Sequence, residues 1–380
     1  MINAAIFPQL PTPSEWLLDW NALVARFAWL RAMADVPQDP VYHAEGDVLT
    51  HTRMVVAATI ANASWQVAPV DTRIVQFAAA LLHDVAKPAT TRVEEGRIIS
   101  PGHARRGELM ARTLLYTAAG CETPLPFAVR EQVTKLVRHH GLPLWFYEKP
   151  DPARAVIAAG QSAQLDQVAD LAEADVRGRI CPDAPALLER VTLFREYTTE
   201  LDCATTPYPF GSNLARYRYI TGLQTDPNYV PYDDAVCEVV LMSGLPGAGK
   251  DTWIATHLPD WPVISLDAIR AEFGISPTDP QGTVVQMAKE RARVYLRRGQ
   301  SFVWNATNIT RVLRDPLIAL FTAYHARVRL VYVEVPYAML LGRNGTRGAK
   351  ALPDTVLHRL VSRLEVPDAS EAEVVLYAVA

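Results

Sequence analysis

The stretch 239–253 constrains the fold of this chain more than any other. An apolar run leads into a glycine-rich turn that ends in a lysine, and the turn nearly matches the phosphate-binding pattern G-x-x-x-x-G-K-[ST]. Glycines let backbone N–H groups converge on a phosphate, and a following helix N-terminus adds partial positive charge. The stretch therefore predicts a strand, a nucleotide-binding loop and a helix. The predicted nucleotide contacts are Gly244, Gly247, Ala248, Gly249 and Lys250.

The residue after the lysine departs from this pattern. The pattern places Ser or Thr there as a magnesium ligand, whereas this chain has Asp251 followed by Thr252. A carboxylate is favourable at a helix N-terminus and is a hard oxygen donor of the kind that Mg²⁺ prefers. We therefore interpret Asp251 as a direct or water-mediated magnesium ligand, with Thr252 as the alternative. Lys250 then reaches the β- and γ-phosphates of ATP or another nucleoside triphosphate.

Length and composition indicate two globular domains. A chain of 380 residues exceeds the usual size of a single compact core. The net charge of −4 argues against broad non-specific coating of nucleic acid, although gripping a strand end needs only a few local cations. The cysteines form no C-x-x-C pair, and no apolar run approaches the roughly 18 residues of a membrane span. We therefore expect a cytoplasmic protein with no membrane segment.

The character of the sequence changes twice along the chain. Residues 1–203 carry apolar residues at helical spacing, including a helix expected over 14–34, and predict an all-α domain. Residues 204–234 are rich in Pro, Tyr and Gly and predict a linker. Residues 235–380 alternate strand and helix patterns, which predicts an α/β P-loop domain with a parallel sheet. Its expected strands are 237–243, 262–266, 302–305 and 327–335.

Histidines and acids gather at helix ends in the first domain. The histidines concerned are His51, His83, His103, His139 and His140. Imidazole nitrogen and carboxylate oxygen are the ligands expected of a metal site that polarises phosphate, although a lone histidine at a helix end is often a cap. The pair His83-Asp84 is more informative. Adjacent residues at a helix end chelate one ion only when neighbouring helices supply further ligands.

Four sequence blocks follow one another between residues 41 and 180. They read H-x-E-G-D-V-x-x-H-T, H-D-x-x-K-P, G-H-x-x-x-G and E-A-D-x-R-G-R. Within them, His51, His83-Asp84 and Asp175 resemble the H…HD…D signature of the HD-domain metal-dependent phosphohydrolases. The blocks are similar to the HD module appended to bacterial tRNA nucleotidyltransferases, which acts on 2′,3′-cyclic phosphates and 2′-phosphates.

This resemblance implies a metal site in an HD-type helical domain. A divalent transition metal would be held by His51, His83, Asp84 and Asp175. His103 and one of the pair His139 and His140 become candidates for a second metal or for phosphate contact. Adjacent helical residues point about 100° apart, so only one histidine of the pair can be a ligand, and we favour His139.

The same resemblance gives roles to residues around the metal. Lys87 would act in catalysis by neutralising charge on the phosphoryl oxygens. Arg177 or Arg179 would orient the substrate. His43 and Asp47 are expected to position the helix that bears His51 rather than to bind metal.

Two charged pairs follow later strands of the second domain. Asp267 stands just past the second strand, opposite the phosphate loop, where a carboxylate can take a proton from an attacking hydroxyl or cap a helix. Arg270, one helical turn on, can bind a phosphate next to that hydroxyl. Arg343 and Arg347 lie in a glycine-containing segment that suits a lid over ATP, or else a solvated helix face.

The motifs of residues 236–367 read, in order, G-x-P-G-x-G-K, D-x-x-R, x-A-T-N and R-N-x-x-R. Together they resemble the kinase module of polynucleotide 5′-hydroxyl kinases. The resemblance implies that Asp267 activates the 5′-OH, that Arg270 holds the adjacent phosphate, and that Arg343 and Arg347 grip ATP. Many relatives have Asp where this chain has Asn305, so no metal-bound carboxylate is expected there.

An HD phosphohydrolase joined to such a kinase resembles the bacterial HD-domain polynucleotide kinases, which heal broken RNA or DNA ends. Ribonuclease-type cleavage leaves a 2′,3′-cyclic phosphate and a 5′-OH, which a classical ligase cannot join. The resemblance implies that the first domain removes 2′,3′-cyclic, 2′- or 3′-phosphate by metal-activated water attack. The second domain would phosphorylate the 5′-OH with ATP and Mg²⁺, and a separate ligase would seal the ends.

Two other functions remain open at this point. The chain could be a small-molecule or nucleotide kinase joined to a nucleotide phosphatase, since such kinases share the phosphate loop and the strand-end Asp. Alternatively, the HD half could be a non-catalytic nucleotide sensor that regulates the kinase. Lys87 beside a complete metal shell argues against the sensor, because a sensor has no need of it.

Overall fold

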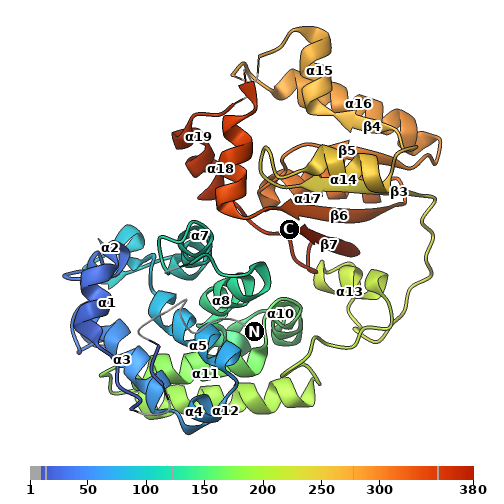
Figure 1. The fold of residues 1–380 in the computed structure, drawn as a ribbon. Coiled ribbons are helices and arrows are strands. Elements are labelled where there is room, and N and C mark those ends of the chain that lie inside the picture. The colour runs from blue at the N-terminus through green and yellow to red at the C-terminus, as the bar shows by residue number, and fades with distance from the viewer. Residues whose placement is uncertain (1–9, 13–14, 122, 277, 349–350) are drawn as a thin grey trace. The chain divides into compact units, whose positions relative to one another are not determined.

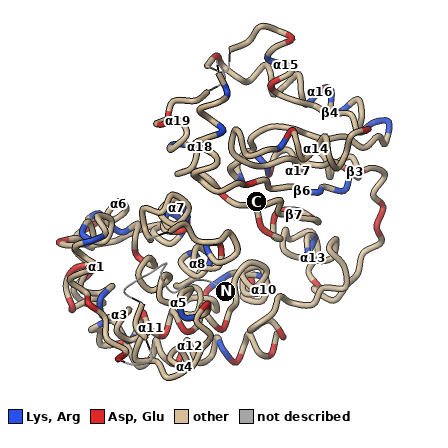
Figure 2. The backbone as a smooth tube through the Cα atoms, in the orientation of Figure 1, with Lys and Arg blue, Asp and Glu red and all other residues tan. Residues whose placement is uncertain are grey.

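The computed structural model describes residues 10–12, 15–121, 123–276, 278–348 and 351–380. The chain separates into two compact units, residues 1–209 and 210–380 (Figure 1). Lys and Arg are interspersed with Asp and Glu along both units (Figure 2). Among the described residues, no helix is both long and apolar enough to cross a membrane.

The first unit is helical apart from one short antiparallel hairpin, β1–β2 (Figure 1). Its elements are α1 (Trp20–Arg26), α2 (Ala28–Arg31), α3 (Val48–Ala61), α4 (Ala63–Val67), α5 (Val70–Leu82), α6 (Lys87–Thr90), β1 (Arg92–Glu94), β2 (Arg97–Ile99), α7 (His103–Tyr116), α8 (Phe127–His139), α9 (Leu142–Trp145), the 3-10 helix η2 (Phe146–Glu148), α10 (Pro152–Gly160), α11 (Leu165–Arg177) and α12 (Ala184–Glu200). Helices α3, α5, α8 and α11 pack around a common apolar core.

The single helix expected over residues 14–34 is two short helices among the described residues, and Ser14 lies outside them. Phe27 separates α1 from α2 in an extended conformation, with φ −103° and ψ 111°. This break leaves Phe27 only 5% exposed, and Leu23 and Leu30 on either side are fully buried. Burial in the core therefore outweighs the continuous helical spacing of the sequence.

Helix ends in the first unit carry the polar residues singled out from the sequence. Asp47 caps α3 by accepting a hydrogen bond from the Thr50 backbone N–H at 2.8 Å, which fixes the first turn that bears His51. His83 directly follows α5, and Gly102 precedes α7 in a left-handed conformation with φ +70°. These ends turn toward the same buried region because their helices share one core.

A buried ionic network joins α7 to α8. Arg112 is 1% exposed and donates to Glu131 at 2.9 Å and to Glu108 at 2.9 Å. Lys135 donates to Glu108 at 3.0 Å, and Arg130 donates to Glu131 at 2.9 Å. Because every member has a partner of opposite charge, the network holds these two helices in register without an isolated buried charge.

The second unit is a parallel five-stranded sheet in the order β4-β5-β3-β6-β7, with helices packed against it (Figure 1). Its elements are α13 (Asn213–Ile220), β3 (Cys237–Ser243), α14 (Lys250–His257), β4 (Val263–Ser265), α15 (Leu266–Phe273), α16 (Gly282–Arg297), β5 (Phe302–Asn305), α17 (Arg311–Thr322), β6 (Ala326–Glu334), α18 (Tyr337–Gly345), α19 (Asp354–Val361) and β7 (Val374–Val379). The predicted α/β domain with a parallel sheet is confirmed, and β7 adds a strand that the sequence reading missed.

The segment 204–234, expected as a linker, contains helix α13. Ser212 caps this helix, and Tyr217 is buried in the core of the second unit. Arg216 donates hydrogen bonds to the backbone carbonyls of Ala372 at 3.3 Å and Glu373 at 2.6 Å. Helix α13 is therefore a packed part of the second unit.

Replacing Arg112 with Met should destabilise the chain by about 3–5 kcal/mol, because the buried carboxylates of Glu108 and Glu131 lose their shared partner. Urea denaturation measures this change, and hydrogen exchange in α7 and α8 locates it. Arg291→Met is the matched control, since the side chains of Arg291 and its partner Glu272 are 42% and 50% exposed. The control should change stability by less than about 1 kcal/mol. Equal losses in both variants would contradict a stabilising network.

Acid should weaken the same network through Glu108. Burial raises the pKa of Glu108, but Lys135 and Arg112 outweigh it and lower this pKa to about 2. The folded-state pKa is thus below the unfolded value of about 4.3, so the stabilisation is present above that value and is lost as pH falls toward 2. The difference in unfolding free energy between wild type and Glu108→Gln should shrink between about pH 5 and pH 2. A difference that stays constant over this range would refute the ionic contribution.

Candidate functional site

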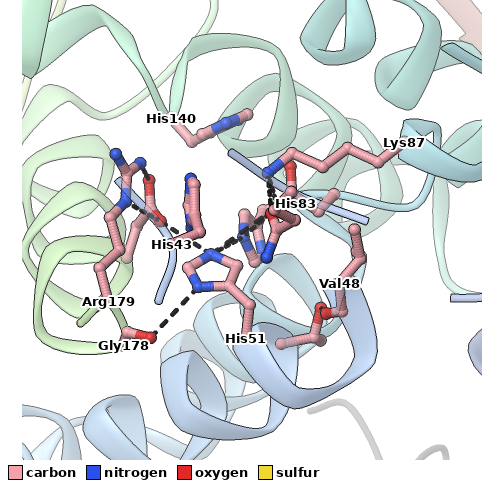
Figure 3. A network of polar contacts seen from close by, with 12 residues as sticks. His43, Val48, His51, His83, Lys87, His140, Gly178 and Arg179 are labelled. Carbon is pink, nitrogen blue, oxygen red and sulfur yellow. Dashed lines mark hydrogen bonds and ion pairs between the residues drawn. The ribbon is translucent and has the colours of Figure 1, made fainter. Parts of the chain in front are cut away.

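Buried histidine and carboxylate side chains from several helices meet in the first unit (Figure 3). His51 lies in the first turn of α3, and Nε2 of this ring is 3.3 Å from Nε2 of His83 and 3.0 Å from Oδ1 of Asp175. His103 begins α7, and its Nε2 is 3.3 Å from Nε2 of His140, the residue that follows α8. The chain thus brings two histidine pairs together in one buried cluster.

The other ring nitrogen of each histidine contacts a backbone carbonyl oxygen. The carbonyls belong to Gly178 for His51, at 3.2 Å, and to Ala80 for His83, Ser100 for His103 and Val137 for His140, each at 2.8 Å. A carbonyl can only accept, so each Nδ1 carries a proton and donates it. In the neutral ring this leaves the Nε2 lone pair bare. Two bare lone pairs 3.3 Å apart repel each other unless a metal ion or a proton lies between them.

Asp84 lies between the two histidine pairs. Its Oδ2 is 3.2 Å from Nε2 of His83 and 2.7 Å from Nζ of Lys87, and its Oδ1 is 3.6 Å from Nε2 of His103. Oδ1 is buried and accepts no hydrogen bond from the described residues. A buried carboxylate oxygen without a donor is costly unless an ion or a ligand completes it. Asp84 would therefore be a ligand for a cation held in this cluster.

Both buried aspartates of the cluster are ionised. Burial raises the pKa of Asp84, but Lys87 and His83 outweigh this and hold that pKa well below its usual range. Burial also raises the pKa of Asp175, but Arg179 and His51 outweigh burial and hold this pKa well below its usual range. Two buried carboxylates in one small volume create a strongly negative point.

The histidine rings complement these carboxylates. Burial lowers the pKa of His140 to about 3, so this ring is neutral and can donate its Nε2 lone pair to a cation. Burial also lowers the pKa of His51, but its contacts with Asp175 and Glu45 outweigh this, and the net shift is upward. Positive charge is thus favoured where the two aspartates and the ring of His51 meet.

The donor set fits divalent transition metals. Two groups, His51–His83–Asp175 and Asp84–His103–His140, each offer donor atoms that lie within 4.8 Å of one another. Imidazole nitrogen mixed with carboxylate oxygen suits Zn²⁺, Mn²⁺ or Fe²⁺ better than Mg²⁺ or Ca²⁺. All six residues except His140 were predicted as ligands from the sequence.

The preference for His139 is corrected to His140. His140 is 4% exposed and lies in the cluster, whereas His139, the last residue of α8, is only half-buried and belongs to neither donor group. The contact of His140 Nδ1 with the Val137 carbonyl at the helix end aims this ring inward. The 100° step between adjacent helical residues turns His139 away from the same point.

Lys87 and Arg179 are the predicted cations that contact the carboxylates of the cluster. Lys87 donates to Oε1 of Gln38 at 2.6 Å in addition to its ion pair with Asp84. Arg179 donates to Oδ1 of Asp175 at 3.1 Å, whereas Arg177 pairs with Glu173 at 2.7 Å outside the cluster. Of the two candidate arginines, Arg179 therefore lies at the site (Figure 3).

Sequence reasoning missed Gln38 and Glu45 as parts of the site. Oε1 of Glu45 lies 2.8 Å from Nδ1 of His43 and 2.9 Å from Nδ1 of His51, so this carboxylate anchors both rings. Glu45 stood inside the block H-x-E-G-D, which was a usable signal. Gln38 stands alone in a proline-containing segment, and only the fold brings it to Lys87.

The phosphate loop joins β3 to α14 at the centre of the sheet of the second unit. Gly244, Gly247 and Gly249 have φ values of +147°, +87° and +110°, a region that side chains strongly disfavour. A Cβ on Gly244 would lie 2.4 Å from the carbonyl oxygen of Val333 on β6. Ala248, between the other two glycines, is buried. The glycines thus serve both the turn and the close approach of a neighbouring strand.

Lys250 folds back onto the loop in this structure. Its Nζ donates to the carbonyl oxygens of Gly244 at 2.8 Å and Leu245 at 3.0 Å. Arg343, on α18, donates to the Gly247 carbonyl at 3.3 Å and to the Ala248 carbonyl at 3.2 Å. Lys250 and Arg343, two of the three cations predicted to bind ATP, therefore lie at the loop itself.

Asp267 and Arg270 follow strand β4 on helix α15, as the sequence predicts. Ser265 is the N-cap, since its Oγ accepts from the Ala268 backbone N–H, so Asp267 does not have the alternative role of a cap. Asp267 is exposed and forms an ion pair with Arg270. Arg270 also donates to Oε1 of Gln281 at 3.0 Å, which holds its guanidinium beside the carboxylate.

Residues 305–308 tie strand β5 to the phosphate loop. Nδ2 of Asn305 donates to Oδ1 of Asp251 at 2.6 Å. The backbone N–H of Gly244 donates to the Thr307 carbonyl at 2.9 Å, and Nδ2 of Asn308 donates to the Met242 carbonyl at 2.8 Å. The x-A-T-N motif therefore supports the loop from the neighbouring strand.

A family model matches most of the second unit. Residues 239–367 match a family model described as an AAA domain, so this unit contains a P-loop domain of that kind. Three solved structures are similar at low scores. A candidate kinase from Chloroflexus aurantiacus has 21% identity and a TM-score of 0.33, over 38% of this chain and 86% of its own.

The other two of these solved structures are similar at comparable scores. A sugar kinase from Janibacter sp. HTCC2649 has 21% identity and a TM-score of 0.30, over 37% of this chain and 85% of its own. A gluconokinase from Sinorhizobium meliloti 1021 has 19% identity and a TM-score of 0.29, over 38% and 83%. At these scores, neither likeness bears on the substrate of this chain.

Replacing His140 with Ala should remove one of the two donor groups, and the chain should then retain less transition metal than wild type. Metal content after incubation with Mn²⁺ or Zn²⁺ and dialysis, read by mass spectrometry, measures this loss. His139→Ala is the matched variant and should keep the wild-type content. Equal metal content in the two variants would contradict the assignment of His140, rather than His139, as the ligand.

Replacing Gly244 with Ala should cost about 1–3 kcal/mol of stability and weaken ATP binding about tenfold or more, because the new Cβ displaces the loop from β6. Thermal unfolding and calorimetric titration with ATP measure the two effects. Gly282→Ala is the control, since a Cβ there meets no atom within 4 Å. Normal ATP affinity in Gly244→Ala would show that the close contact with Val333 does not set the loop.

Proposed function

We propose that this chain is a bifunctional enzyme that heals the ends of broken RNA or DNA. Its second unit would phosphorylate a 5′-OH end, and its first unit would remove a 2′,3′-cyclic phosphate or a 2′- or 3′-phosphate. The observation that carries the proposal is the presence of two chemically different groups of polar side chains in one chain. One is a buried histidine–carboxylate cluster, and the other is a P-loop with a strand-end Asp-x-x-Arg pair.

The kinase reaction follows from residues at the phosphate loop. Lys250 and the loop N–H groups bind the β- and γ-phosphates of ATP, and Asp251 is placed to hold Mg²⁺, which neutralises phosphate charge. Asp267 takes the proton of the 5′-OH while the 5′-oxygen forms a bond to the γ-phosphorus. The bond between the γ-phosphorus and the β,γ-bridging oxygen breaks, and ADP leaves. The exposed Asp267 carboxylate can meet a bulky polynucleotide end.

Arginines of the second unit position the two substrates. Arg270, held by Gln281 beside Asp267, is placed to bind the phosphate that follows the 5′-nucleoside. Arg343 already contacts the loop carbonyls and can turn to the γ-phosphoryl oxygens when ATP enters. The pKa of Lys250 is lowered to about 8, mainly by burial and in part by repulsion from the positive charge of Arg347. Arg347 is therefore close enough to act on charges at the phosphate loop.

The hydrolytic reaction follows from the buried cluster. A divalent transition metal held by these ligands supplies Lewis acidity toward a phosphate and toward water. Asp84 and Asp175 hold negative charge there, and the four Nδ1–carbonyl contacts fix the rings. Lys87 and Arg179 are the cations on opposite sides of the cluster and can bind phosphoryl oxygens. This pairing of fixed ligands with two flanking cations favours phosphohydrolysis over a purely regulatory metal site.

The combined activity accounts for both sites with a single substrate. Cleavage that leaves a 2′,3′-cyclic phosphate also leaves a 5′-OH, and neither end can be sealed until both are altered. One chain with both activities yields a 3′-OH and a 5′-phosphate. A separate ligase would then join them.

A short RNA with a 5′-OH and a 2′,3′-cyclic phosphate tests the proposal. With ATP, Mg²⁺ and a transition metal, wild type should alter both ends. Lys250→Ala should lose only 5′-phosphorylation, and Asp84→Ala only 3′-end healing, each by about 100-fold or more. Gel electrophoresis before and after treatment with a separate phosphomonoesterase shows which phosphates each RNA end carries, because this enzyme leaves a 2′,3′-cyclic phosphate in place.

Two outcomes would contradict this function. If wild type leaves both RNA ends unchanged but phosphorylates or hydrolyses free nucleotides or sugars, the chain is a small-molecule enzyme pair. If Asp84→Ala changes the rate of the kinase while wild type shows no phosphatase activity on any phosphate ester, the first unit is a sensor.

A further inference from the structure

The side chains that face each other across the phosphate loop and strand β5 have an unusual arrangement. In P-loop enzymes, a hydroxyl that follows the lysine and a carboxylate on a neighbouring strand hold Mg²⁺ together. In this chain the position after the lysine is the carboxylate Asp251, and the facing residue at the end of β5 is the amide Asn305. Both positions depart from the pattern, and the two departures are opposite in kind.

The structure joins these two residues directly. Nδ2 of Asn305 donates to Oδ1 of Asp251 at 2.6 Å, and Asn305 is 9% exposed. Asn305 ends β5, which lies between β3 and β4, so its backbone is fixed by the centre of the sheet. A hydroxyl facing a carboxylate would form the same one-donor hydrogen bond with the same total charge of −1. The donor and the carboxylate have exchanged sides.

We propose that Asp251 and Asn305 are an exchanged pair, in which Asp251 is the protein's carboxylate ligand for Mg²⁺ and Asn305 is the positioning residue that aims it. The hydrogen bond occupies Oδ1, so Oδ2 is the oxygen that would serve the metal. Asp251 lies in the first turn of α14, where the helix N-terminus and Lys250 stabilise its negative charge. Asn305 acts through Asp251 and does not itself touch the metal.

This pair has a consequence for charge. A second carboxylate at position 305 would face Asp251 across a hydrogen-bond distance and would add repulsion toward the phosphates of ATP. The amide avoids this while still donating. The asparagine at 305 is thus the complement of the aspartate at 251, which explains both departures by one hydrogen bond. The proposal rests on ATP use by the second unit, as set out above.

The test measures the dissociation constant of ATP by calorimetry with and without Mg²⁺, using the full chain. Asp251→Thr has no carboxylate at either position and should lose the Mg²⁺-dependent gain in affinity by about tenfold or more. Asp251→Thr combined with Asn305→Asp restores the usual hydroxyl and carboxylate, and should recover the gain to within about threefold of wild type. Asn305→Asp alone should weaken ATP binding when Mg²⁺ is absent.

The controls separate this proposal from folding and from the proposed function. Asp251→Asn keeps the size of the side chain and should lose the gain from Mg²⁺ with only a small fall in melting temperature. Thr256→Ala, one turn further along α14, should match wild type in ATP binding. If the double variant binds ATP no better with Mg²⁺ than Asp251→Thr does, the exchange is wrong. This result is independent of whether an RNA end is phosphorylated, because no acceptor is present.

Discussion

The buried charge of Asp84 and Asp175 is the constraint on which the first unit depends. Two carboxylates with depressed pKa values lie in an apolar core, where isolated charges are costly. Lys87 and Arg179 offset this cost through ion pairs with the two carboxylates. The histidine rings donate Nδ1–H to backbone carbonyls, which leaves each Nε2 directed at the cluster. Every helix that supplies a candidate ligand has either its first or its last turn at this cluster. The packing of these helices therefore determines the geometry of the site.

Much of the fold could be predicted because its signals are local. The glycine-rich loop fixes a strand, a turn and a helix within one short segment, and the alternation after it gives a parallel sheet. The break at Phe27 could not be predicted, because the spacing of apolar residues is the same in a bent and a straight helix. Strand β7 was missed because it pairs with β6 across a long stretch of chain.

The site divides in the same way. His51, His83, Asp84 and Asp175 could be found because they stand in ordered motifs. The choice between His139 and His140 could not be made, since it depends on which ring the end of α8 turns inward. Gln38 reaches Lys87 only through the fold. Asn305 was visible as a departure, but its partner Asp251 became evident only from the contact between them.

The two sites also differ in the metals that their donors select. The cluster of the first unit offers four imidazole nitrogens and two carboxylates, a set that binds transition metals more tightly than magnesium. The phosphate loop offers only oxygen donors, with Asp251 as its carboxylate, and this set suits a hard ion that keeps most of its water. The histidine cluster would therefore hold a transition metal in preference to Mg²⁺. In the proposed enzyme, this difference in donors would let a transition metal serve the first unit while Mg²⁺, bound with ATP, serves the second.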